Sequence, residues 1–202
     1  MRLYVESNFI LEIALYQAEA EAALEIMQQA ATDRVELAVP QFALCEPITT
    51  VHRRQSERLK FAKELEDIAA QVGRSVHHQK LAQQARVVVQ LLREDQSKDM
   101  DRLERTLRDL AAVATTVPVD SSVLERALEY RDSLGVSRLQ DAIMLASVIG
   151  HIHADPVADA RFVTTDGHFA DRAVKAELDA HRCGLIRSFV GALDCITKGQ
   201  VG

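Results

Sequence analysis

The sequence predicts an α/β protein with a three-layer α/β/α architecture, in which helices cover both faces of a mostly parallel sheet of four or five strands. Short apolar runs rich in strand formers alternate with longer segments whose apolar residues recur every three or four positions. Strands that alternate with helices favour parallel pairing, because each helix provides the crossover to the next strand. Residues 55–114 show helical periodicity alone, which predicts a helical insertion within one domain that covers residues 1–202.

The first half of the chain predicts a strand-helix-strand-helix order. Residues 2–6 form a short run of strand formers, and residues 17–31 are rich in alanine with an apolar face at helical spacing. Residues 35–39 predict the second strand. Pro40 is well placed to begin the next helix, because its fixed φ angle suits the first helical turn.

The middle of the chain predicts two or three helices. Breaks in the pattern fall at residues 73–75, where Gly73 lies, and around residues 97–101. Such a helical insertion would pack on the α/β core, project from it, or present a surface to a partner.

Strands and helices alternate again in the last part of the chain. Residues 115–119, 161–165 and 184–187 predict three more strands. Two sequences of capping-box type, Ser122-x-x-Glu125 and Ser137-x-x-Gln140, predict where two helices begin. Gly135 is expected to end the first of these helices, and the second is expected to run to about residue 152.

Composition excludes several classes of protein. The chain has 202 residues, of which 48% are hydrophobic and 27% charged, with eight glycines and four prolines, so disordered and collagen-like chains are excluded. Charged and polar residues interrupt the N-terminal apolar run, which argues against a secretory signal and predicts a cytoplasmic protein without membrane contact. The cysteines are Cys45, Cys183 and Cys195, and this odd set without C-x-x-C spacing predicts reduced thiols.

The net charge of −6 repels polyanions, so binding to nucleic acid would require a local basic patch. Arg53 and Arg54 lie in such a segment, residues 52–60, and Arg138 lies further along the chain. A solvated helix face with mixed charges explains the same segment equally well.

Four acids fall where a parallel sheet binds its ligands, at the carboxyl ends of the strands. Glu6 closes the first strand, Asp166 closes the fourth, and Glu46 lies about one and a half turns after Pro40. Asp141 lies near the start of a helix that begins at the same edge.

Asp141 is the most informative of the four. It is the sole carboxylate in the apolar segment 137–152, and burial of an unpaired carboxylate costs several kcal/mol. The alternative is that it only favours the helix dipole. Simpler roles exist for the others too: Glu6 can be solvated or paired with an arginine, Asp166 can cap a turn, and Pro47 can kink the helix at Glu46 or mark its start.

Four segments together resemble the PIN-domain family of nucleases, including the toxin-like members of bacterial toxin-antitoxin pairs. The segments are Tyr4-Val-Glu-Ser-Asn-Phe-Ile-Leu11, Leu44-Cys-Glu46, Gly135-Val-Ser-Arg-Leu-Gln-Asp-Ala-Ile-Met-Leu-Ala146 and Phe162-Val-Thr-Thr-Asp-Gly-His-Phe169. They cover both ends of the chain and leave its helical middle unmatched. The blocks with Asp141 and Asp166 are the most specific.

The resemblance implies a PIN-like fold and a divalent-metal-dependent endoribonuclease. In this reading Glu6, Glu46, Asp141 and Asp166 hold Mg²⁺ or Mn²⁺, which activates water for attack on an RNA phosphodiester. The supporting residues would be Asn8, Thr164, Thr165 and Asp171. The RNA backbone would be held by Arg53, Arg54 and Arg138. An antitoxin or another protein partner and a homodimer are also implied.

One residue departs from the family pattern. Family members begin their acidic set with an aspartate where this chain has Glu6, whose side chain is longer by one methylene. The geometry of Mg²⁺ is strict, so either the backbone absorbs this length, or the site prefers Mn²⁺, or the site is degenerate. The last case predicts a catalytically weakened module that binds RNA or protein.

Overall fold

The computed structural model describes residues 1–198, with the side chains of residues 95–97 excepted. Its centre is one five-stranded sheet in the order β3-β2-β1-β4-β5, and every neighbouring pair is parallel. The strands are β1 (Arg2–Val5), β2 (Glu36–Pro40), β3 (Ala114–Val117), β4 (Ala160–Val163) and β5 (Cys183–Ile186). The predicted α/β class and the parallel sheet are therefore confirmed.

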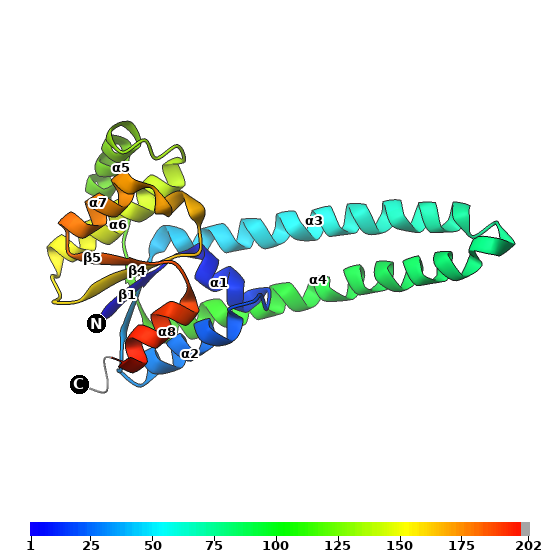
Figure 1. The fold of residues 1–202 in the computed structure, drawn as a ribbon, viewed down its shortest axis with the longest axis horizontal. Coiled ribbons are helices and arrows are strands. Elements are labelled where there is room, and N and C mark those ends of the chain that lie inside the picture. The colour runs from blue at the N-terminus through cyan, green and yellow to red at the C-terminus, as the bar shows by residue number, and fades with distance from the viewer. Residues whose placement is uncertain (199–202) are drawn as a thin grey trace.

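The central strands are buried because helices cover the sheet on both sides. The helices are α1 (Ser7–Ala14), α2 (Ala20–Ala31), α3 (Gln41–Val72), α4 (Gln79–Val113), α5 (Ser121–Ser133), α6 (Leu139–Ala154), α7 (Arg172–Ala180) and α8 (Phe189–Lys198). Two short 3-10 helices, η1 (Val76–His78) and η2 (Gly167–Ala170), complete the set for the described residues. Figure 1 shows α5, α6 and α7 on one side of the sheet and α1, α2 and α8 on the other.

The strand order explains this division of the helices. From β1 to β2 to β3 the chain moves toward one edge of the sheet, and from β3 to β4 to β5 it moves toward the other. Because parallel crossovers are right-handed, the reversal of direction places the crossover helices α5, α6 and α7 on the opposite face. Helix α8 follows the last strand and packs against α2. The point of reversal lies between β1 and β4, and ligands bind at such a crevice beyond the strand ends.

Helices α3 and α4 form a long hairpin that projects from the sheet (Figure 1). At about 1.5 Å per residue, the 32-residue α3 is about 48 Å long. Only its base joins the core, through residues such as Val51 on α3 and Leu103 and Leu110 on α4. The break predicted at residues 73–75 is present, whereas the break predicted around residues 97–101 is wrong because α4 runs through it.

Both predicted capping boxes are wrong. The cap of α5 is Asp120, whose carboxylate accepts a hydrogen bond from the Val123 amide at 3.0 Å and another from the Ser122 hydroxyl. Helix α6 begins at Leu139 after Arg138, without a side-chain cap, so Ser137 does not cap it. Pro47 lies inside α3, which starts at Gln41, so the helix does not begin at that proline.

The cysteines are free thiols in the described part of the chain, as predicted. Cys183 is buried in β5, and burial raises the pKa of its thiol to about 12, whereas Cys45 and Cys195 are exposed. Among residues 1–198, no helix combines the length and the apolar character that crossing a membrane requires.

Candidate active site

The carboxyl ends of β1 and β4 place two of the predicted residues side by side. Val5 pairs with Val163 in the sheet, so Glu6 and Thr164 leave adjacent strands at the same level. The Thr164 hydroxyl, which is fully buried, donates a hydrogen bond of 3.0 Å to Oε1 of Glu6. The same hydroxyl accepts a 2.9 Å hydrogen bond from the backbone N–H of Asp166. Thr164 thus connects Glu6 to Asp166.

Glu6 is a buried carboxylate, only 3% exposed. Its other oxygen, Oε2, accepts hydrogen bonds from the backbone N–H of Asn8 at 2.9 Å and from the Ser7 hydroxyl at 3.1 Å. Burial raises the pKa of Glu6 to about 7, although these hydrogen bonds and that from Thr164 oppose the rise, and the charge of Asp166 adds to it. Glu6 therefore takes up a proton near neutral pH unless a cation compensates its charge.

Glu46 reaches the same place from the second turn of α3. Its Oε2 lies 2.8 Å from the Ser7 hydroxyl, the same group that bonds to Glu6. One hydroxyl carries one proton, so it can donate to only one of the two carboxylates at a time. The Glu46 side chain is otherwise exposed, which leaves it free to move toward a ligand.

Asp141 lies in the first turn of α6 and is half-buried. Its Oδ2 is buried and has no hydrogen-bond partner within the described residues. Burial raises the pKa of this carboxyl, and the negative charges of Asp166 and Glu46 add to the effect, while Arg138 and His168 oppose it. A buried acceptor without a partner costs about 1–3 kcal/mol, so this oxygen is a suitable ligand for a cation.

Asp166 and Asp171 both cap short helices. Asp166 accepts a hydrogen bond from the His168 amide at 2.8 Å through Oδ1, and Asp171 accepts one from the Ala173 amide at 2.8 Å. Asp171 also lines a cavity of about 120 Å³ together with Asp141 and His168. The capping role considered for Asp166 is therefore present, and it occupies only one of the two carboxylate oxygens.

A larger cleft, of about 440 Å³, opens beside these acids. It is lined by Glu46, Thr49, Thr50, Arg53, Arg138, Gln140 and Asp141. Two exposed arginines thus share a surface with two of the four acids. Arg54 faces elsewhere, because its Nη1 donates at 3.2 Å to the Gln17 side chain once that amide is oriented to satisfy Glu12. The side chains of Asn8 and Thr165 make no hydrogen bond within the described residues.

The donors suit a hard cation, but they are not assembled around one. Within the described residues, no three His, Cys, Asp or Glu side chains stand close enough to hold a metal ion. The unpartnered Oδ2 of Asp141 and the exposed Glu46 would have to close on a cation beside Glu6 and Asp166. Carboxylate oxygens are the ligands that Mg²⁺ and Mn²⁺ prefer, so the residues present fit such an ion in their chemistry.

Ser7 is the omitted residue that contacts two of the predicted acids. Its position between Glu6 and Asn8, directly after a buried strand, was the available signal, since a hydroxyl there can reach neighbouring carboxylates. Thr49, Thr50 and Gln140 were also omitted, and they are recognisable only once the cleft is formed.

Comparisons of this chain with protein-family models, curated proteins and solved structures give no match.

Proposed function

We propose that this chain is a PIN-like, divalent-metal-dependent endoribonuclease. The observation that supports the proposal is the gathering of Glu6, Glu46, Asp141 and Asp166 at the carboxyl edge of one parallel sheet, next to its point of reversal. Carboxylates repel one another, and the raised pKa values of Glu6 and Asp141 reflect burial and this repulsion. A divalent cation would stabilise such a site by compensating the negative charges of the buried carboxylates.

The acids would hold Mg²⁺ or Mn²⁺, which supplies an activated water and stabilises the oxygen that leaves the phosphate. Ser7 and Thr164 hold the Glu6 carboxylate in place, so this ligand is positioned before a cation arrives. The backbone N–H of Asp166, bonded to Thr164, fixes the next acid along β4.

The cleft beside the acids supplies the RNA-binding part of the proposal. Arg53 and Arg138 lie on either side of it, on α3 and just before α6, and both are exposed. Phosphate contacts from arginine position a nucleic acid without reading its sequence. The cleft therefore fits an RNA backbone whose phosphate lies near Glu46 and Asp141.

The decisive experiment compares Asp141→Asn with the unmodified protein. The unmodified protein should cleave RNA with Mn²⁺ or Mg²⁺ and stop with EDTA, and Mn²⁺ should raise its melting temperature. Asp141→Asn should lose at least about 100-fold in cleavage rate together with the Mn²⁺ effect on melting, since it removes a negatively charged ligand. Asp132→Asn, on the exposed surface of α5, is the matched control. Cleavage that survives EDTA and Asp141→Asn would contradict the proposal.

A second candidate function is a catalytically weakened PIN-like protein that binds RNA or protein. The observation that favours it is the engagement of Glu6, both of whose oxygens already accept hydrogen bonds from the protein. The longer side chain brings the carboxylate against Thr164 and Ser7 and satisfies it there, without a cation. In this case the acids at the sheet edge would be a remnant of a metal site.

Glu6→Asp separates the two candidates. If the natural site is impaired, the shorter acid should raise Mn²⁺ affinity and cleavage by about tenfold or more, because a ligand position that fits the ion is restored. If the natural site is active with Glu6, the shorter acid should instead lower both.

The growth of cells that express the natural chain or Asp141→Asn tests toxicity, which a toxin of a toxin-antitoxin pair requires.

A further inference from the structure

The α3–α4 hairpin is a two-stranded antiparallel coiled coil beyond the core. Its buried and half-buried residues are spaced alternately by three and four positions, as in a heptad repeat. We call these residues, which face the other helix, the seam residues. In the outer half of the hairpin they are Ala62, Leu65 and Ala69 on α3, and Ala82, Ala85 and Val89 on α4. Small side chains let the helices approach closely, but they leave little apolar surface inside the hairpin.

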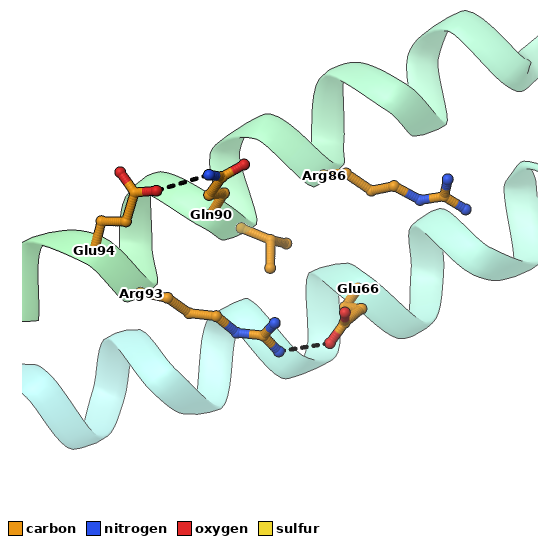
Figure 2. A pocket seen from close by; sticks show the side chains of 6 residues that line it. Glu66, Arg86, Gln90, Arg93 and Glu94 are labelled. Carbon is orange, nitrogen blue, oxygen red and sulfur yellow. Dashed lines mark hydrogen bonds and ion pairs between the residues drawn. The ribbon is translucent and has the colours of Figure 1, made fainter.

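One side of the hairpin is polar. The residues directly after the seam positions Leu65 and Leu92 are Glu66 and Arg93, and they form an ion pair of 2.6 Å across the two helices. Figure 2 shows this pair, with Arg86 further toward the tip on the same side. Residues that follow seam positions on the two helices therefore share one side, so residues that precede seam positions share the opposite side.

The opposite side is apolar. Each residue directly before Ala62, Ala69, Ala82 and Val89 is apolar and exposed, and a fifth apolar residue, one helical turn after the last of these, extends the row. This apolar flank consists of Phe61, Ile68, Leu81, Val88 and Leu91, with exposed fractions from 44% to 60%. A hollow of about 330 Å³ lies along it, lined by Val88 and Leu91 together with Arg58 and Leu92.

Charged residues at the rim of the apolar flank indicate what covers it. Glu57 and Glu64 lie one turn before and one turn after Phe61, on the same face of α3. Lys98 lies two turns after Leu91, on the corresponding face of α4. Arg58 of α3 pairs with Asp99 of α4, so Lys98 lies at the same height along the hairpin as residues 57–64. None of the three forms an ion pair within the described residues. The α3 rim thus carries two acids at the level where the α4 rim carries one lysine.

We propose that the apolar flank is an interface between two copies of this chain, whose hairpins lie side by side with both tips pointing the same way. A two-fold axis along the hairpins places α3 of one copy against α4 of the other, so that Lys98 meets Glu57 and Glu64 of the second copy. The reverse orientation would face α3 with α3, and Lys98 would then not meet Glu57 and Glu64 of the second copy.

The area of the apolar flank is consistent with a second copy of this chain as its partner. Two helices of about 10 Å diameter give a face about 20 Å wide, and α3 from residue 57 to its end at Val72 extends it over about 24 Å. The resulting area of about 480 Å² is somewhat over half of the 800 Å² or so that each partner contributes to a specific interface, which fits a dimer that dissociates in the micromolar range. The interface would also produce a four-helix bundle, which buries the apolar residues that the two-helix hairpin leaves exposed.

Light scattering on the full chain tests the proposal. The natural chain should be a dimer at about 100 µM, where dissociation constants in the micromolar range leave few monomers. Ile68→Glu should weaken the dimer at least tenfold. Leu59→Glu is the matched control, because Leu59 is also exposed and apolar on α3 but follows the seam residue Arg58 and so lies on the polar side. Circular dichroism should show the same helix content in both variants.

Charge reversal tests the orientation. Lys98→Glu and Glu64→Lys should each weaken the dimer several-fold, and the double variant should restore it. A natural chain that stays monomeric at about 100 µM overturns the proposal, and so does a dimer that Leu59→Glu disrupts and Ile68→Glu does not. A monomer that binds an added amphipathic helix through this flank also overturns it, since the occupant would then be another protein.

Discussion

Glu6 places an ionisable carboxyl group in a nearly closed environment, and the consequence is a pH-dependent stability. Its pKa is about 7 in the folded chain against 4.5 for an ordinary glutamate. The folded state therefore holds the proton more tightly than the unfolded state does. The stability that this provides is complete below about pH 4.5 and is lost as the pH rises to about 7.

We predict that Glu6→Gln removes this pH dependence. The difference between the two pKa values corresponds to about 3 kcal/mol, so without metal the variant should be more stable than the natural chain by up to that amount at pH 8, and similar to it at pH 4. Urea unfolding in EDTA at the two pH values measures the effect. An equal pH slope in both proteins would show that Glu6 titrates normally.

The residue scale also shows why only part of the site was predictable. Glu6, Asp141 and Asp166 are visible in the sequence because each is an acid at the end of an apolar run. The direction of an exposed arginine is not visible in this way: Arg53 lines the cleft, whereas its neighbour Arg54 turns to Gln17. Adjacent residues on a helix point about 100° apart, and only the surrounding helices decide which one faces the site.

Among the elements, the hairpin is secured to the core by Asp99. This residue of α4 is buried, and it pairs with Arg58 of α3 at 2.5 Å and with Arg102 of its own helix. Arg102 in turn donates to the backbone carbonyl of Ala14 at 2.8 Å, at the end of α1. The network therefore joins three helices where the hairpin leaves the sheet.

Asp99→Ala should loosen this junction. The substitution removes the shared acceptor of two arginines, and we expect a loss of about 1–3 kcal/mol in the free energy of unfolding. Chemical denaturation measures it. Glu66→Ala, which breaks the exposed pair with Arg93, is the control and should cost less than about 1 kcal/mol. Equal costs for both variants would contradict a structural role for Asp99.

The sequence predicted whether a segment is a helix or a strand better than it predicted the residues at which the segment begins and ends. The central strands β1, β2 and β4 are short, mostly apolar runs buried between helices, so their composition reveals them, whereas the edge strand β3 is partly exposed. The cap of α5 is different, because Asp120, Ser121 and Ser122 are all good capping residues. The extended backbone at Asp120 decides between them, and it is set by the chain that leaves β3.

For the whole molecule, the core and the hairpin differ in how they are stabilised. The core cluster includes α3 only as far as Val51 and α4 only from Leu103 onward, with Met100 packed against it. The outer hairpin contributes mainly the small seam residues Ala62, Ala69 and Ala82. The chain could therefore keep its sheet without the outer hairpin.

We predict that a variant in which a short turn replaces residues 62–95 keeps the fold of the core. Few buried apolar contacts are lost, so its melting temperature in dilute solution should change by no more than a few degrees. Thermal denaturation and the near-ultraviolet spectrum measure this. Loss of cooperative unfolding would show that the core depends on the outer hairpin.

Helix α3 carries Glu46 near its start and Phe61 and Ile68 some 22–33 Å further along, at about 1.5 Å per residue. The start of this helix lies among the carboxylates. A bound neighbour that tilts the outer part of α3 is therefore expected to shift Glu46 relative to Ser7, by a smaller distance. Occupation of the distant surface and the affinity of the acids for a cation would then be mechanically coupled.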